Sequence, residues 1–146
     1  MCSSDLTPFS IREIGEADHS DVASLLDAAR TSSAQFRGSD VLEALLAKVN
    51  VSELPGRVAV VDGEVKGLVA WTIAEQMLTI EVLYVEPESR GVGIGENLVF
   101  AAMEHARSAG LERIAGRALP GDRETKNVYE RTGLVSQVIL VGRTLT

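Results

Sequence analysis

Residues 78–110 read LTIEVLYVEPESRGVGIGENLVFAAMEHARSAG, and this stretch decides the fold. Its first part, 80–85, is apolar and rich in β-branched residues, which predicts a buried strand. Pro87 ends that strand because proline has no amide hydrogen to donate to a ladder. A glycine turn follows, and then apolar residues recur at helical spacing until Gly110. The stretch therefore predicts a strand, a glycine turn and a helix.

The glycine turn predicts an anion-binding site, because bare amides at the positive end of a helix dipole favour a phosphate. A dinucleotide-binding loop would need a third glycine at position 96 or 98, where Glu96 and Leu98 stand. A Walker loop would need a Gly-Lys pair, which this turn lacks. A tight turn without any ligand is the alternative. The residues of the turn are Arg90, Gly91, Val92, Gly93, Ile94, Gly95 and Glu96.

Length, charge and cysteine content narrow the class of protein. The chain has 146 residues, which fits one domain over 1–146, and its net charge of −7 disfavours nonspecific binding to nucleic acid. Cys2 is the single cysteine, and His19 and His105 lack ligand spacing, so we expect no disulfide and no metal. No apolar run is long enough to span a membrane, and the N-terminus does not read as a signal peptide. We expect a cytoplasmic monomer or homodimer.

The rest of the chain predicts a mixed α/β fold. The pair Asp62-Gly63 predicts a tight hairpin between two strands, which with residues 80–85 would form an antiparallel meander. Asp18 is expected to cap the first helix, and Ser39 or Asp40 is expected to cap a second helix. The fourth helix is expected over 122–132. The expected strands cover 9–14, 57–61, 65–74, 80–85, 113–118 and 134–145.

These residues resemble the GNAT superfamily of N-acetyltransferases. The R-x-x-G-x-G pattern at 90–95, preceded by L-x-V-x-P at 83–87, has the form of that family's acetyl-CoA loop. Residues 128–134 resemble its L-Y-E-x-x-G-F segment. The resemblance covers essentially the whole chain, with its specific motifs in 79–134. It implies an α/β (α+β mixed) fold, a single domain with a central, mostly antiparallel mixed sheet and about four flanking helices.

The resemblance also implies how acetyl-CoA is held as a co-substrate. The amides of 91–96, with Arg90 alongside, would bind the pyrophosphate. The backbone of Leu83 and Val85 would pair with the pantetheine arm, as an added strand does, and an amide near Val85 would polarise the thioester carbonyl.

The fourth predicted helix carries the implied proton donor. Asp122, Thr125, Lys126 and Tyr129 share one helix face by spacing, and we expect this face to meet the cofactor. Tyr129 matches the family's tyrosine, whose phenol would protonate the departing thiolate; a merely packed tyrosine is the alternative. Asp122 stands where the family has an asparagine that contacts the pantetheine arm. An ionised carboxylate accepts hydrogen bonds but cannot donate them, so that contact is altered.

Glu81 is the candidate general base. It lies on the strand before the glycine turn, flanked by apolar residues, and simple alternation places its side chain on the face of Leu83 and Val85. Glu75 and Glu86 are the fallback candidates. A purely structural or solvated Glu81 is the alternative.

The charges are distributed unevenly. Residues 1–56 carry nine acids and four bases, whereas 57–146 carry twelve acids and ten bases. In the family the first two helices form the acceptor side, so an acidic wall there would favour a cationic amine. The alternative is a set of solvated helix faces. The acids concerned are Glu16, Asp18, Asp21, Asp27, Asp40, Glu43 and Glu53.

Three functions follow from this reading. The leading one is an N-acetyltransferase that moves an acetyl group directly from acetyl-CoA to a primary amine of a small molecule, protein or peptide. The second is a GNAT-fold protein that binds acyl-CoA without turnover, as a sensor or a subunit. A nucleotide-binding oxidoreductase is disfavoured by the glycine spacing.

Overall fold

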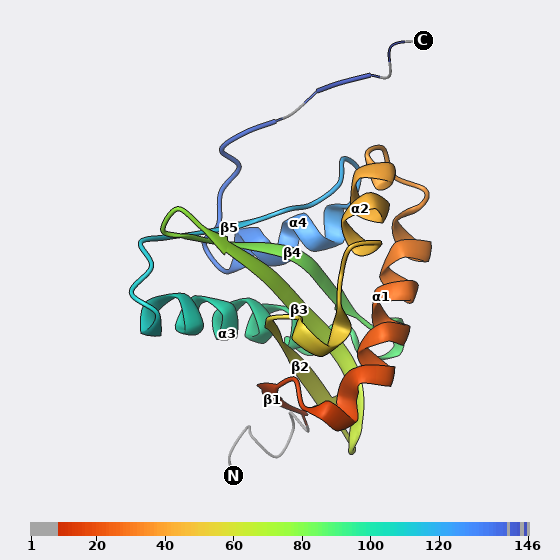
Figure 1. Ribbon diagram of the computed structural model, residues 1–146, viewed down its shortest axis with the longest axis vertical. Coiled ribbons are helices and arrows are strands. Elements are labelled where there is room, and N and C mark those ends of the chain that lie inside the picture. Colours follow the sequence, from red (N-terminus) through yellow and green to blue (C-terminus); the bar gives the residue numbers. More distant parts are fainter. Residues whose placement is uncertain (1–8, 140, 144, 146) are drawn as a thin grey trace.

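The fold is seen in a computed structural model that describes residues 9–139, 141–143 and 145 (Figure 1). Cys2 lies outside this part of the chain. The strands are β1 (Phe9–Glu13), β2 (Gly56–Val61), β3 (Glu64–Ala74), β4 (Met77–Val85) and β5 (Arg113–Gly116). The α-helices are α1 (His19–Ser33), α2 (Ser39–Leu46), α3 (Ile94–Ser108) and α4 (Arg123–Arg131). The fold is therefore of the predicted α/β class.

The five strands form one sheet in the order β1-β2-β3-β4-β5. All neighbours are antiparallel except β4 and β5, which run parallel. The predicted hairpin at Asp62-Gly63 is confirmed, since both residues have positive φ, 51° and 81°, as a two-residue turn requires. The predicted meander of β2, β3 and β4 is confirmed as well.

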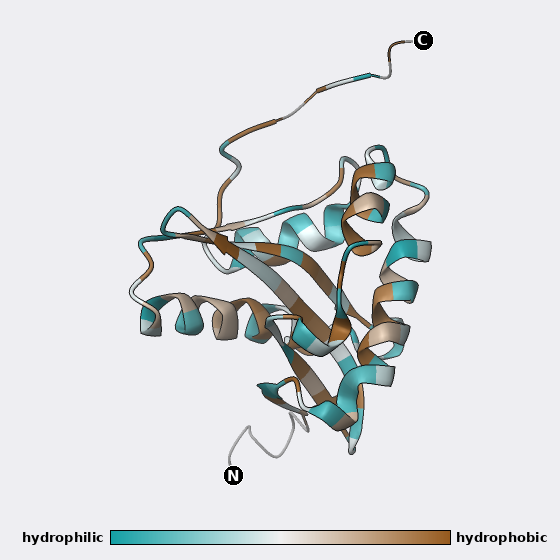
Figure 2. Cartoon of the chain, viewed as in Figure 1, coloured by the Kyte–Doolittle hydropathy of each residue, from teal (hydrophilic) through white to brown (hydrophobic). Residues whose placement is uncertain are grey.

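Helices cover both faces of the sheet, and each face has its own core (Figure 1). Apolar residues of α1, such as Val22 and Leu25, pack with Leu68 and Val82 on one face. On the other face α3 and α4 pack against the sheet around Trp71. The strands between these layers carry many hydrophobic residues, whereas hydrophilic and hydrophobic residues alternate along the helices (Figure 2).

A β-bulge interrupts β4 at Glu81. Ala70 of β3 pairs with Val82 and the next residue, Trp71, pairs with Ile80, so Glu81 has no residue opposite it. An extra residue of this kind shifts the alternation of the strand. The bulge therefore changes which residues of β4 turn toward which face.

The predicted strand over 134–145 is wrong for the residues described there. None of 134–139, 141–143 and 145 forms a strand, and Figure 1 shows this segment leading away from the sheet. Its apolar side chains are largely exposed, for example Val138 at 84%. The run has strand-forming residues, but a strand also needs a partner, and within the described residues β5, the last strand of the sheet, pairs only with β4.

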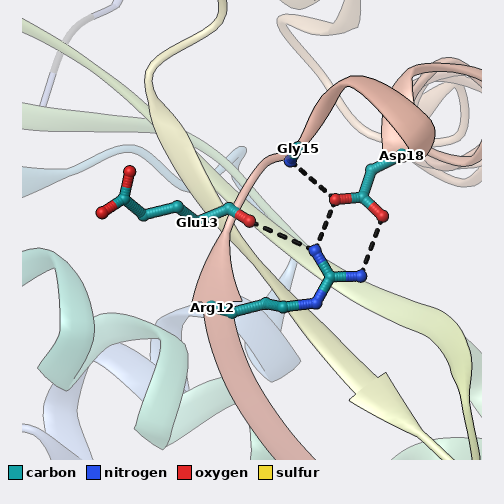
Figure 3. A network of polar contacts seen from close by, with 4 residues as sticks. All are labelled: Arg12, Glu13, Gly15 and Asp18. Atoms are coloured by element: carbon teal, nitrogen blue, oxygen red, sulfur yellow. Dashed lines mark hydrogen bonds and ion pairs between the residues drawn. The ribbon is translucent and has the colours of Figure 1, made fainter.

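Two predicted helix caps are wrong: Asp18 does not cap α1, and α2 begins at Ser39 directly after Gly38, so neither Ser39 nor Asp40 caps α2. A short 3-10 turn, Glu16–Asp18, runs straight into α1, so Asp18 has a helical backbone where a cap needs an extended one. Its buried carboxylate instead accepts two hydrogen bonds from Arg12, at 2.6 and 2.9 Å, and one from the amide of Gly15 (Figure 3). These contacts lower the pKa of Asp18, with the Arg12 hydrogen bond as the largest cause.

Within the described residues, no helix is both long and apolar enough to cross a membrane. The same residues contain no group of three or more His, Cys, Asp and Glu side chains placed to hold a metal ion.

Candidate active site

A cavity of about 910 Å³ opens where β4 and β5 separate. The two strands pair from Met77–Arg113 to Ile80–Gly116 and not beyond. The cavity has two parts. One part is lined by the end of β4, the 90–96 turn except Val92, and α4, and we name it the cofactor half after the sequence-based expectation. The other is lined by α1, α2, the connection between them and residues 117–119, and we name it the acceptor half on the same basis.

The end of β4 offers unpaired backbone groups to the cavity. Before the bulge, the carbonyl of Ile80 accepts from Arg117 on the β5 side, so even-numbered residues face β5 there. After the bulge, the amide of Glu86 bonds to Lys66 of β3, so even-numbered residues now face β3. By this alternation Leu83 and Val85 turn their amides and carbonyls toward the side from which β5 has departed. A ligand in the cavity can satisfy them.

The glycine turn presents a row of free amides. Gly91 and Gly93 have φ of 87° and 90°, a region that favours glycine, and Gly93 starts α3 without a side-chain cap. Within the described residues, no protein acceptor receives the amides of 91–96, and the first one bonded is that of Asn97. Gly95 is buried and lies next to Val128 of α4, which a Cβ at this position would meet at 3.4 Å. The turn therefore lies tightly against α4 with its amides unsatisfied, which suits an anion.

Arg90 is held by the protein on three sides. Its Nε donates to the carbonyl of Val85 at 2.7 Å, its Nη1 pairs with Glu124 at 2.8 Å, and its guanidinium lies 5.4 Å from the centre of the Tyr84 ring. The side chain thus ties the glycine turn to β4 and α4. Because Arg90 occupies the Val85 carbonyl, the open groups of this edge are the Val85 amide and both groups of Leu83.

Two other arginines add positive charge to the cofactor half. Arg131 pairs with Glu96 at 2.5 Å and so neutralises the carboxylate closest to the free amides. Arg123 lines the cavity and, within the described residues, forms no ion pair. Arginine suits phosphate because its fork of donors matches the oxygens. In the sequence, the place of Arg123 directly after Asp122, at the start of a helix, is the signal that points to it.

Glu81 reaches the cavity from the bulge. Its carboxylate accepts from the Thr72 hydroxyl at 2.7 Å and pairs with Nε of Arg117 at 2.6 Å, with only 10% of the side chain exposed. The expectation that it shares a face with Leu83 and Val85 is wrong, because the bulge adds one residue to the alternation. Glu75 and Glu86 do not line the cavity.

Tyr129 is packed more closely than the sequence suggests. Its side chain is buried, its ring occupies the space that a Cβ on Gly116 would need, and its hydroxyl donates to the carbonyl of Arg117 at 3.0 Å. Tyr129 is not among the residues lining the cavity. Burial raises the pKa of Tyr129 well above the usual range, and the charges of Asp122 and Glu81 add to this. The phenol therefore stays protonated and is a weaker acid than a free tyrosine.

Comparison with known proteins settles the family. The profile described as the acetyltransferase (GNAT) family matches residues 21–134, most of the chain. This protein belongs to the GNAT family. No curated protein sequence matches it significantly.

Solved GNAT structures share this fold at low sequence identity. An aminoglycoside acetyltransferase from an uncultured soil metagenomic sample, in complex with sisomicin, is 22% identical, with a TM-score of 0.70 over 99% of this chain and 100% of the other. A ribosomal-protein-alanine N-acetyltransferase from Brucella melitensis biovar Abortus 2308 is 20% identical, with a TM-score of 0.70 over 93% and 99%. Aminoglycoside N-acetyltransferase AAC(6')-Iy, in complex with CoA, is 16% identical, with a TM-score of 0.70 over 94% and 100%.

The start of α4 carries the point where this GNAT chain departs from its family's pattern. Asp122 lines the cavity and caps α4, accepting from the amide of Thr125 at 3.1 Å, a role that asparagine and aspartate fill equally well. Thr125 lines the cavity too. Lys126 does not, because it turns toward Glu130, 3.6 Å away. Of the four side chains expected on one face, only the first two reach the cavity.

The acceptor half does not have the expected acidic wall. None of the seven acids of the first helices and their connections lines the cavity, so the expectation of an acidic acceptor wall is wrong. They lie on outward surfaces or, like Asp18, form internal contacts. The lining contains Arg117 and a set of apolar side chains instead, which composition alone does not reveal.

Proposed function

We propose that this GNAT protein is an N-acetyltransferase that moves an acetyl group from acetyl-CoA to a primary amine by direct transfer. One observation carries the proposal: free amides at 91–96, open backbone at Leu83 and Val85, and the Glu81 carboxylate all border one cavity. A pyrophosphate, an extended amide-bearing arm and an amine each find a complementary group there. When bound, acetyl-CoA supplies an activated acetyl thioester.

The cofactor half holds its ligand through the main chain. Micromolar binding corresponds to about −8 kcal/mol, and one charge-assisted hydrogen bond contributes roughly 1.5–3 kcal/mol, so several amides must act together. The amides of 91–96 receive the pyrophosphate, with Arg123 beside them. The backbone of Leu83 pairs with the pantetheine arm. The free Val85 amide is positioned to donate to the thioester carbonyl as negative charge develops on it.

Glu81 is the group that receives the amine. Both its oxygens already accept hydrogen bonds, from Thr72 and Arg117, which fix the carboxylate in place at the bulge. A fixed, ionised carboxylate binds the ammonium form and takes its proton, directly or through a water molecule. No covalent acyl-enzyme is required.

The second function, acyl-CoA binding without turnover, is favoured by one observation. The hydroxyl of Tyr129, the expected proton donor, already donates a hydrogen bond to the carbonyl of Arg117, and burial raises the pKa of Tyr129. In an active enzyme the thiolate then takes its proton from Tyr129 after a local rearrangement, or from solvent.

The test is a panel of primary amines incubated with acetyl-CoA, with release of free thiol as the readout. The panel covers aliphatic amines, amino acids, polyamines, an aminoglycoside and a peptide with a free N-terminus. We expect sustained release with at least one member, and loss of that release in Glu81→Gln. Calorimetric binding of acetyl-CoA without release for any member would establish the non-catalytic function instead.

A further inference from the structure

The acceptor half of the cavity has an apolar lining. The side chains come from α1, the α1–α2 connection, α2 and the β5–α4 connection, and they line the same cavity as Glu81 at the bulge in β4. The other side chains contributed by α1 and the connection after it are two serines and one glutamine, all neutral. The apolar members are Ala29, Phe36, Val41, Leu42, Leu45, Ala118 and Leu119.

In the described part of the chain, Arg117 is the charged side chain of this half, and Glu81 of β4 borders it at the junction with the cofactor half. They are joined by the 2.6 Å contact between Nε of Arg117 and Oε1 of Glu81. The remaining nitrogens of Arg117, Nη1 and Nη2, have no partner among the described residues, and 65% of this side chain is exposed. Arg117 therefore keeps two donors for a ligand.

This arrangement opposes a polycationic acceptor. A polyamine or aminoglycoside would bring several positive charges to a wall with one carboxylate, which Arg117 already partly neutralises. The apolar side chains cannot replace the water lost by additional ammonium groups. A ligand with one ammonium, one anionic group and an apolar body matches the wall in charge and in polarity.

We infer that the acceptor is a free α-amino acid with an apolar side chain, an inference that rests on the proposed acetyl transfer. The α-ammonium lies at Glu81, the α-carboxylate takes the two free nitrogens of Arg117, and the side chain lies among Val41, Leu42 and Leu45. Arginine and carboxylate make a two-point contact that also orients the amine.

The reaction balances with groups already named. Glu81 or a water molecule takes one proton from the ammonium, and the neutral nitrogen attacks the thioester carbonyl. A C–N bond forms, the C–S bond breaks, and the thiolate leaves with the bonding electrons. The nitrogen loses its second proton, and the thiolate gains one, so an N-acetyl amino acid, CoA thiol and one net proton result. The amide nitrogen of the product carries no positive charge, so the attraction to the Glu81 carboxylate that held the ammonium is lost.

A matched substrate series tests this inference. L-leucine, L-leucinamide, 3-methylbutylamine and spermidine share a primary amine but differ in the carboxylate and in the apolar body. We expect kcat/KM to be highest for leucine and at least about tenfold lower for the other three, because the Arg117 contact or the apolar contact is missing. Arg117→Gln should lower the ratio of leucine to 3-methylbutylamine by about tenfold. Arg113→Gln, at an exposed arginine that begins the strand just before Arg117 and does not line the cavity, should leave that ratio unchanged.

Each other outcome has one meaning. Faster turnover of spermidine than of leucine, or equal turnover of leucine and 3-methylbutylamine, would overturn the amino-acid assignment. The release of thiol in either case would still support the proposed acetyltransferase activity. Faster turnover of leucinamide would overturn it in favour of a peptide N-terminus. Binding of acetyl-CoA without thiol release from any amine would overturn the proposed function itself.

Discussion

The two halves of the cavity are built from different parts of the polypeptide. The cofactor half uses main-chain groups of one contiguous stretch, from Leu83 to Glu96, completed by α4. The acceptor half uses side chains of α1, α2 and the segment 117–119 after β5, and that segment is far from the two helices in the sequence. A main-chain site depends on where glycines and strands fall, whereas a side-chain site depends on packing. The first can be recognised from local sequence, and the second cannot.

The largest expected effect comes from closing the main-chain site. Gly93→Val places a branched side chain at φ 90°, against the free amides, where a Cβ meets only Asn97 at 3.7 Å. We expect acetyl-CoA binding to weaken by about a hundredfold or more, since several charge-assisted bonds are lost together. Isothermal titration calorimetry measures this.

Gly63→Val is the matched control for Gly93→Val. Gly63 also has positive φ, 81°, and open space around it, but it lies in the β2–β3 hairpin. Both variants should unfold more easily by a similar amount, about 1–2 kcal/mol, and only Gly93→Val should lose the cofactor. Equal loss of binding in the two would mean that backbone strain, and not the amide site, explains the result.

The next effect concerns the junction of the two halves. Glu81→Gln keeps the Thr72 contact but removes the charge, so we expect kcat/KM for the amine to fall roughly 10²–10⁴-fold with the affinity for acetyl-CoA unchanged. Glu86→Gln, five residues along on a part of the chain that does not line the cavity, should have no such effect. Full activity of Glu81→Gln in steady-state assays would show that another group or solvent is the base.

The contrast between the halves also explains what sequence reasoning achieved. The hairpin at Asp62-Gly63, the meander and the 90–95 turn depend on local backbone preferences, and the structure has each of them. The bulge at Glu81 escaped prediction because it comes from register with β3, not from a residue type. The strand expected at 134–145 failed because strand propensity does not supply a partner.

A smaller effect is expected on the far side of β5. Tyr129→Phe removes the hydroxyl that donates to Arg117, so the free energy of unfolding should fall by about 1 kcal/mol. If the phenol also protonates the thiolate, kcat should fall several-fold with little change in KM for acetyl-CoA. Steady-state measurements of kcat test whether Tyr129 donates this proton. An unchanged kcat in Tyr129→Phe would mean that Tyr129 only packs in the core.

The raised pKa of Tyr129 adds a pH signature. Folding favours the neutral phenol, so the stability that it contributes is complete below the unfolded pKa of about 10 and is lost as the pH rises toward the folded value. The stability difference between the wild type and Tyr129→Phe should therefore shrink above about pH 10. Chemical denaturation over that range measures it.

We expect no catalytic effect from substitutions of the acids that were expected to form the acceptor wall. Asp18→Asn weakens the contacts with Arg12 and Gly15, so the free energy of unfolding should fall by about 2 kcal/mol while kcat and KM for the amine stay the same. Asp21→Asn, at an exposed residue in the first turn of α1, should change neither the stability nor the kinetics.

The pKa of Asp18 is lowered in the folded state, so the stability that its carboxylate contributes is present above about pH 4 and is lost as the pH falls through the lower folded value. The gap in stability between wild type and Asp18→Asn should close in acid. A raised KM for the amine in a stably folded Asp18→Asn protein would show that the charge of Asp18 does act on the acceptor. The description of the acceptor half as an apolar site without influence from these acids would then be wrong.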